Sequence, residues 1–340
     1  LTRASIRTLQ VVVYAMLFSA VVFFGLTRTK VGRDGLRQQL ETQFNDRFAG
    51  TLQVGTLQGD LINTLYASNV QLLDPEGRVV ASVDSLIATP RWTSLLGGTV
   101  SVRSLTLIRP HLALQRAADG SWNAGAAFRP LQPSPDTDRA VDWTLTDIAI
   151  RNGSVGTVNQ GDDPPWIQKG WLFNYADAEV QALNARATLE WTGEERLAEV
   201  YDVSMRLPGP AVTIRSLQGQ VVQAANGWTL NQLSLDTEGS QIRGSGSVAH
   251  LTDSSVPEID LDLAPSQLDH DELRRLVPRL PLAGTSTLEG HIHGDVSRLV
   301  VETFEVAHGN SQIRLSGTVF GLPDSADVEA RLDDTQLRIE

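Results

Sequence analysis

The C-terminal half of the chain repeats itself at an offset of about 71 residues, and this feature constrains the fold more than any other. Residues 240–251, SQIRGSGSVAHL, return as residues 311–322, SQIRLSGTVFGL. The match runs without a gap from residue 216 against residue 287, and beyond Leu251 the offset changes by two, so that Leu263 meets Leu332. Such a period is typical of elongated proteins whose units contact mainly their neighbours and which offer a long surface rather than a compact active site. The alternative is a chance similarity between two amphipathic β segments.

From Thr51 onward the chain has the alternation of β-strands. Ile259, Leu261 and Leu263 share one face of a segment whose other face carries acidic residues. One apolar and one polar face are typical of an antiparallel sheet. The sequence therefore predicts a mainly β protein, an elongated and twisted antiparallel sheet with few short helices.

Local signals refine this prediction. A shift in apolar phase between Val102 and Leu105 predicts a bulge. A short helix is expected over residues 269–277, begun by Asp269 and stopped by Pro278. Hairpins or tight turns are expected at Asp119-Gly120, Asn152-Gly153 and Asn226-Gly227.

One segment near the start has the composition of a membrane span. Residues 9–26, LQVVVYAMLFSAVVFFGL, contain no charge and as a helix would be about 27 Å long. A cleaved signal peptide is the alternative, but the run ends in bulky residues followed by basic ones, which favours an uncleaved single-pass anchor. Its N-terminus is expected inside because the tail is short; the flanking charges are nearly balanced. The predicted anchor residues are Leu9, Val12, Leu17, Val21, Phe24 and Leu26.

The chain divides into five predicted parts. They are the anchor at 1–30, an amphipathic helix at 31–50, a first β unit at 51–132, a linker at 133–139 and repeated β units at 140–340. The apolar stripe of the helix recurs every fourth residue, from Leu36 to Phe48. It favours a cap on the end of the β structure over a membrane-surface role. The strand-like pattern at 335–340 is expected to continue in a longer chain or to be completed by another chain.

Composition and motifs argue against several functions. The formal net charge of −12 disfavours a nucleic-acid partner, and the lack of cysteine excludes disulfides and thiolate chemistry. Nucleotide-binding, nucleophile-elbow and zinc-protease motifs do not occur in the sequence. We therefore expect no enzyme activity, no catalytic residue and no cofactor.

Two polar patterns carry weaker signals for metal. His291 and His293 lie on one face of an expected strand and form a possible metal pair, but no third ligand is evident, so a structural role is favoured. Glu258, Asp260 and Asp262 resemble a solvated strand face more than a calcium site. The sequence therefore predicts no metal site.

Four aromatic residues crowd the segment after a Gly-Asp-Asp-Pro-Pro loop: Trp166, Trp171, Phe173 and Tyr175. Folding back over a sheet end is favoured over contact with a membrane or a partner.

The order of these parts resembles the AsmA-like superfamily, and most closely its TamB-type members. The likeness covers nearly the whole chain and rests on the order of short, degenerate motifs. They are Leu52–Gly59, the Asp-Pro-x-Gly ending of Val70–Gly77, Ser82–Pro90, Leu105–Pro110, Gly120–Asn123, Leu288–Gly294 and Ser311–Gly317. The terminal domain of TamB proteins is not among these residues.

The resemblance implies a taco-shaped β-sheet with an apolar concave face, anchored in the inner membrane with its bulk in the periplasm. It implies phospholipid transport between the two membranes and outer-membrane biogenesis, with membrane phospholipids as partners. The alternative is a scaffold for outer-membrane protein assembly and secretion, with a TamA-like or BamA-like barrel protein and without lipid conduction.

An apolar groove of this kind would be lined by alternate residues of several strands. The candidates are Leu189, Val203, Met205, Leu207, Leu261, Leu263, Ile313 and Leu315. The same residues could instead fill the dry core of a β-sandwich, because alternation gives the face and not what covers it.

Overall fold

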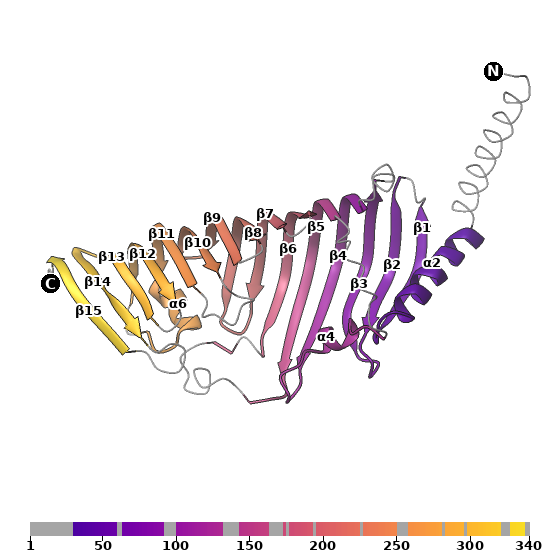
Figure 1. Cartoon of the computed structure of the whole chain (residues 1–340), viewed down its shortest axis with the longest axis horizontal. Helices are drawn as coiled ribbons and strands as arrows, with labels where there is room; N and C mark the ends of the chain where they lie inside the picture. Colours follow the sequence, from indigo (N-terminus) through magenta and orange to yellow (C-terminus); the bar gives the residue numbers. More distant parts are fainter. Residues whose placement is uncertain are drawn as a thin grey trace, which may run out of the picture.

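All strands that the structure describes form one long sheet (Figure 1). The computed structural model describes residues 30–336, except 60–62, 92–99, 132–142, 163–172, 175–176, 193–194, 225–226, 250–257, 281–282, 296–297 and 321–326. Within this part the sheet has 15 strands that follow one another in chain order. The mainly β prediction is confirmed.

Three described helices accompany the sheet. They are α2 (Lys30–Asn45), α4 (Asn123–Ala127) and α6 (His270–Leu276). The strands are β1 (Thr51–Gly59), β2 (Leu65–Leu73), β3 (Val79–Pro90), β4 (Val100–Arg116), β5 (Trp143–Asn159), β6 (Glu179–Thr192), β7 (Glu195–Leu207), β8 (Val212–Ala224), β9 (Gly227–Thr237), β10 (Gln241–Ala249), β11 (Glu258–Asp269), β12 (Thr285–Asp295), β13 (Arg298–His308), β14 (Ser311–Phe320) and β15 (Asp327–Gln336).

The sequence repeat corresponds to a unit of four strands. The offset carries β9, residues 227–237, onto β13, residues 298–308, and it carries β8 and β10 onto β12 and β14. With the two-residue change in offset, β11 corresponds to β15. The repeat is therefore structural, and each unit pairs with the next through a continuous antiparallel ladder.

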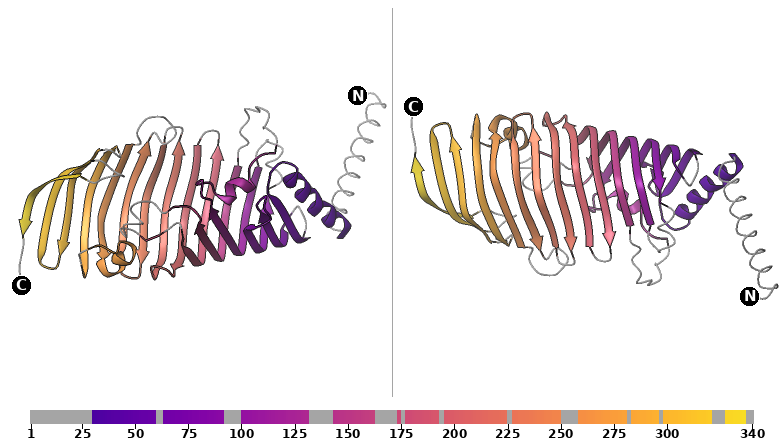
Figure 2. Two further views of the ribbon diagram at one scale, coloured as in Figure 1. Left: turned by 90° about the horizontal axis from the view of Figure 1, so that it is seen from below. Right: turned by 90° about the horizontal axis from the view of Figure 1, so that it is seen from above.

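One strand pair departs from the predicted antiparallel order. β4 and β5 run parallel, with Leu105 opposite Ile148 and Leu112 opposite Val155. Residues 117–142 connect them and include α4, so the chain has enough length to return to the end of the sheet where β4 began. The alternation of apolar and polar residues within a strand does not indicate the direction in which the chain enters the next strand. The sequence pattern therefore did not predict the parallel pair. The connection brings α4 over one face of the sheet (Figure 2).

Helix α2 covers the first edge of the sheet. It begins at Lys30 and ends at Asn45. The predicted helix covered residues 31–50, so the observed helix ends earlier than predicted. Phe48 therefore lies beyond the helix, where its backbone bridges to Pro130. The rings of Phe44, Phe48 and Phe128 pack together with centroids 4.9–6.0 Å apart. The predicted capping role is confirmed.

The best-buried apolar side chains gather near this end. Val80 and Ala127 are almost fully buried and pack with Leu72, while Phe44 of α2 adds to the cluster. The predicted Asp-Pro-x-Gly turn lies beside it. The buried Asp74 carboxylate accepts hydrogen bonds there from the backbone N–H groups of Glu76, at 3.0 Å, and Arg78, at 2.8 Å. The turn thus supplies the partners that a buried carboxylate needs.

A line of left-handed residues extends from β2 to β6, with one such residue on each of β2, β4, β5 and β6. Asn69, Arg109, Asn152 and Ala182 have φ between 48° and 53°. Asp84 lies opposite both Asn69 and Arg109 in the ladder, and its Oδ2 atom accepts a hydrogen bond from Arg109 Nε at 2.5 Å. The ladder register shifts beside Asn152 and Ala182, as at a bulge, whereas Asn69 and Arg109 stay in register with β3. We call this line the bulge line.

Local predictions have mixed outcomes. The turn at Asp119-Gly120 is confirmed, as is the bulge near Val102, where β4 slips against β3. Ala224 pairs with Gly227, so the predicted turn at Asn226-Gly227 lies at a hairpin between β8 and β9. Asn226 itself is outside the described residues. The prediction of a turn at Asn152-Gly153 is wrong, because this pair lies within β5 on the bulge line. Helix α6 is confirmed, and the Asp269 side chain caps it by accepting from the N–H groups of Asp271 and Glu272.

Candidate functional site

The ladder pairs form continuous apolar rows that run across the strands. In the longest row, side-chain positions from β5 to β14 stand directly opposite one another. It contains Leu145, Leu189, Ala198, Val221, Leu230, Gly246, Leu261, Ile292, Val301 and Gly317. A second row contains Leu233, Gly244, Leu263, Gly290, Phe304, Leu315 and Leu332. We call the surface that carries both rows the apolar face.

The register puts every predicted groove residue on the apolar face. Leu189 and Leu261 belong to the first row, and Leu263 and Leu315 belong to the second. Ile313 is two residues before Leu315 and pairs with Val306. A further row connects Val203 through Leu217 and Leu235 to Ile242. Met205 and Leu207 follow Val203 on the same face of β7.

These side chains have intermediate exposure. Each predicted groove residue is neither buried nor exposed. The buried hydrophobic residues of the described part are Val54, Ala67, Leu72, Val80, Ala127 and Val212, of which only Val212 belongs to β7–β15. A core shared by two packed sheets would bury its inward residues. The described strands instead belong to one layer, and nothing in the described part covers the apolar face of β9–β15 with a second sheet (Figure 2).

Glycine residues in both rows leave places on the apolar face where the backbone carries no side chain. Gly290 faces Phe304 across the β12–β13 ladder, and a Cβ atom added at Gly290 would lie 2.7 Å from the Phe304 ring. The large ring therefore lies over the glycine, an arrangement in which an aromatic side chain covers the backbone of its neighbour. Gly246 stands in the same relation to Leu261, with 3.3 Å between the added Cβ and Leu261 Cδ1.

Helix α6 borders one rim of the sheet and is held by buried polar side chains. Glu272 Oε2 accepts hydrogen bonds from Thr237 Oγ1 at 2.5 Å and from Ser240 Oγ at 2.9 Å. His270 Nε2 lies 2.6 Å from Ser286 Oγ. These hydrogen bonds hold α6 against the ends of β9 and β12, while the other polar atoms of the two side chains, Glu272 Oε1 and His270 Nδ1, are buried without a hydrogen-bond partner.

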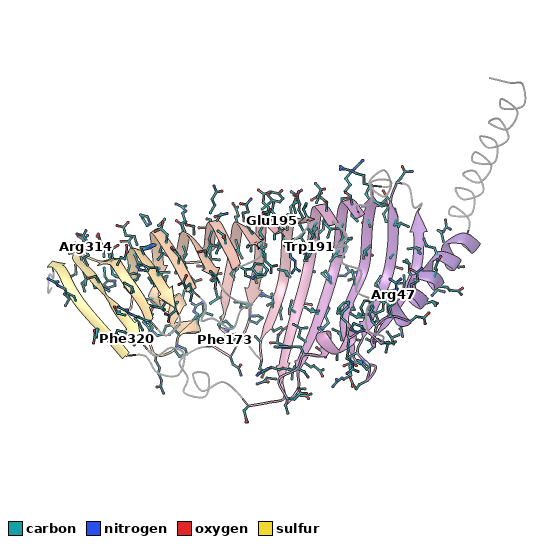
Figure 3. All side chains as sticks on the ribbon, in the orientation of Figure 1. Arg47, Phe173, Trp191, Glu195, Arg314 and Phe320 are labelled. Atoms are coloured by element: carbon teal, nitrogen blue, oxygen red, sulfur yellow. The ribbon has the colours of Figure 1, made fainter. Side chains whose placement is uncertain are left out.

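Residues far apart in the chain meet at this rim. Arg275 Nη1 of α6 donates to the carbonyl of Ala211, between β7 and β8. The backbone N–H of Phe173 donates to the carbonyl of Leu276 at 2.8 Å, and the Phe173 ring lies against Gly209 (Figure 3). Phe173 thus folds back onto the end of the sheet, as predicted. Trp166, Trp171 and Tyr175 lie outside the described residues.

The opposite face of the sheet is polar. Asp260 and Asp262 alternate with the groove residues of β11 and pair with His293 and His291 of β12. A shallow hollow of about 920 Å³ lies on this face over β7–β11, with Gln218, Asn231 and Arg243 among its lining residues. Its lining mixes amides, hydroxyls and charges of both signs and gives no paired acid and base.

Sequence reasoning missed one residue on the polar face. Glu302 lies at a slip in the β12–β13 ladder, where His291 pairs with Thr303 but Ile292 pairs with Val301. Val300 stands opposite His293, and Glu302, two residues further along β13, lies on the same face with its carboxylate 3.7 Å from His293 Nδ1. Alternation gives the face of Glu302, but its nearness to the histidines depends on how β12 and β13 are paired, which alternation does not give.

Two predicted elements lie outside the described residues: the anchor from Leu9 to Leu26 and the linker at 133–139. Among the helices that the structure describes, none combines the length and apolarity needed to cross a membrane. Comparison of the chain with protein-family models, curated proteins and solved structures gave no match.

Proposed function

We propose that this is an inner-membrane-anchored periplasmic protein of the TamB/AsmA type, whose apolar face carries phospholipid acyl chains between the inner and outer membranes. The observation that carries the proposal is the intermediate exposure of one apolar face from β5 to β14. Sheets in soluble proteins ordinarily bury such a face against a second layer. A face without that layer calls for an apolar occupant.

The chemistry of the face favours an acyl chain over a peptide. Inner strands such as β11 use their backbone groups in ladders on both sides, so the face offers mainly side chains. A peptide lying there would leave its own N–H and C=O groups without partners, which is costly. An acyl chain has no such groups, and each buried methylene contributes about 0.8 kcal/mol.

The direction of the rows also supports transport. Strands are spaced at about 4.8 Å, so the row from β5 to β14 is roughly 40 Å long. The row follows the long axis of the sheet, away from α2 (Figure 1). In the sequence, α2 directly follows the predicted anchor. A lipid could therefore move along the face without leaving apolar surroundings.

Photo-crosslinking with a matched pair of positions tests the proposal. Leu261 and Asp262 are adjacent on β11 but point to opposite faces. A photoreactive residue at 261 of the full chain, in a diderm bacterium, should give phospholipid adducts that mass spectrometry detects. The same residue at 262 should give none. Equal adducts at both positions, or no lipid adduct at 261, would refute lipid carriage. Protein adducts alone would favour the alternative, a scaffold for outer-membrane protein assembly with a TamA-like partner.

A further inference from the structure

The polar face carries a cluster of metal-ligating side chains that spans three strands. The ligand atoms of His291, His293 and Glu302 all lie within 4.8 Å of one another. The rings of the two histidines are 5.5 Å apart, and Asp260 Oδ1 of β11 lies 3.9 Å from His291 Nδ1. We propose that these residues form a binding site for a single divalent transition-metal ion, with zinc as the best fit.

The donor set selects the class of metal. Two imidazole nitrogens and one or two carboxylate oxygens suit Zn²⁺ and neighbouring transition metals, whereas Ca²⁺ and Mg²⁺ prefer oxygen ligands alone. Zinc bonds of about 2.0–2.1 Å in a tetrahedron require ligand atoms roughly 3.4 Å apart. The 3.7 Å between His293 Nδ1 and Glu302 Oε1 is already close to that separation. The remaining closure needs only small rotations of side chains that are between 32% and 58% exposed.

An unsatisfied atom points into the cluster. His293 Nδ1 is buried from solvent and has no hydrogen-bond partner. Buried polar atoms without partners are rare, and a bound ion is one way to satisfy them. The two nearby carboxylates also make the surroundings of the histidines negative, which attracts a cation.

The repeat supplies an internal comparison. The positions of His291, His293 and Glu302 correspond to Gln220, Val222 and Asn231 in the preceding unit. There Gln220 pairs with Asn231, and Asn231 Nδ2 donates to Gln220 Oε1 at 3.2 Å, so the corresponding positions adjoin in that unit too. The fold therefore does not need histidine or glutamate at these places. All three ligands occur together in one unit and at none of the corresponding positions of the other.

The site would join β11, β12 and β13 on the side of the sheet opposite the apolar face. A metal bound only by the folded protein stabilises it, so zinc should raise the thermal unfolding midpoint. Because imidazole binds metal in its neutral form, zinc binding should weaken as the pH falls. The proposal does not depend on lipid transport.

Isothermal titration of the full chain with ZnCl₂, in detergent and without a histidine tag, tests the site. We expect one zinc per chain and no comparable heat with CaCl₂. The triple variant His291→Gln, His293→Val, Glu302→Asn copies the residues of the preceding unit and should remove the binding while the protein remains folded by circular dichroism. His111→Ala removes an exposed histidine that bonds to Ser154 on another part of the sheet, and it should bind zinc as the unmodified chain does.

A copper-loaded sample gives a second readout. Its electron paramagnetic resonance spectrum should show coupling to two imidazole nitrogens, and the triple variant should lose it. The proposal is overturned if the unmodified chain binds no zinc, if the triple variant binds zinc as well as the unmodified chain, or if calcium competes equally. In those cases the histidines serve only in polar contacts with Asp260 and Glu302.

Discussion

Glu41 on α2 accepts a hydrogen bond from the backbone N–H of Val54 on β1, with 2.7 Å between Oε1 and the amide nitrogen. Asn45 Oδ1 accepts in the same way from the N–H of Leu52, also at 2.7 Å, and Arg37 donates to the carbonyl of Val54 at 3.3 Å. Side chains of one helix thus satisfy the outward backbone groups of an edge strand. An edge strand whose outward backbone groups are already hydrogen-bonded cannot pair with another chain through them.

Removing this acceptor should loosen the first edge. We expect Glu41→Ala to lower the free energy of unfolding by about 1–2 kcal/mol, because the N–H of the buried Val54 loses a charged partner. Hydrogen exchange should speed up at Val54 before it does at inner strands. Gln38→Ala, at an exposed position of the same helix, should change neither quantity. Unaltered exchange at Val54 in Glu41→Ala would contradict a sealing role for α2.

The close approach at Gly290 predicts a pair of opposite effects. A Cβ atom there would lie 2.6 Å from the Thr303 carbonyl as well as against the Phe304 ring, so Gly290→Ala should destabilise by about 1–3 kcal/mol. Gly156→Ala meets nothing within 4 Å and should be neutral or stabilising by up to about 1 kcal/mol. Chemical denaturation of both variants measures the difference. Equal values for the two would show that Phe304 does not pack against Gly290.

A charged residue introduced on the apolar face distinguishes an open groove from a covered core. Leu261→Asp and Ile313→Asp should abolish lipid recovery from the purified protein, since a carboxylate repels acyl chains. They should cost no more than about 1 kcal/mol of stability if water reaches the face, and about 2 kcal/mol or more if the face is sealed. Gln312→Asp, the exposed neighbour of Ile313, should keep its lipid. A large loss of stability in Leu261→Asp would refute the open groove.

The β13–β14 hairpin should respond to acid through one ion pair. Glu305 Oε2 accepts from Arg314 Nη2 at 2.6 Å and from Nε at 3.1 Å. Hydrogen bonds from Arg314, and then one from Gln312, lower the pKa of Glu305 below its ordinary value. The stabilisation is complete above the unfolded-state pKa and is lost as the pH falls through the folded-state pKa.

Replacing the arginine should reverse the shift. In Arg314→Met the pKa of Glu305 should rise toward its ordinary value, as an NMR titration of its carboxyl carbon would report. The stability difference from the unmodified chain should shrink in acid. Arg243→Met changes the corresponding arginine of the preceding unit and should leave the Glu305 titration where it was. A titration of Glu305 that is the same in Arg314→Met would rule out this pair as the cause.

The sequence predicted those features that depend on residues close together in the chain. Alternation identified the apolar face, the repeat identified a structural unit that contains four strands in the fold, and the Asp269 cap identified α6. The sequence predicted the phase shift near Val102 but none of those on the bulge line. Ala67 and Leu72 are both buried although their odd separation would place them on opposite faces, because Asn69 on the bulge line lies between them.

Features that depend on distant residues were not predictable. The parallel pairing of β4 and β5 depends on the path of residues 117–142, which alternation does not specify. The contact between Glu302 and His293 depends on the pairing register of β12 and β13. The sequence had already singled out the two histidines, but the third ligand became visible only when the ladder register was known.

The chain-order sheet has a consequence for how the protein folds. Because each strand pairs only with its neighbours in sequence, most strands can be added to an existing edge after closing a short loop, at little entropic cost. The parallel β4–β5 pair is different, since residues 117–142 must be traversed before β5 can dock. We therefore expect two phases of zipper-like folding, one from α2 to β4 and one from β5 onward, with the joining of β4 to β5 as the slow step between them.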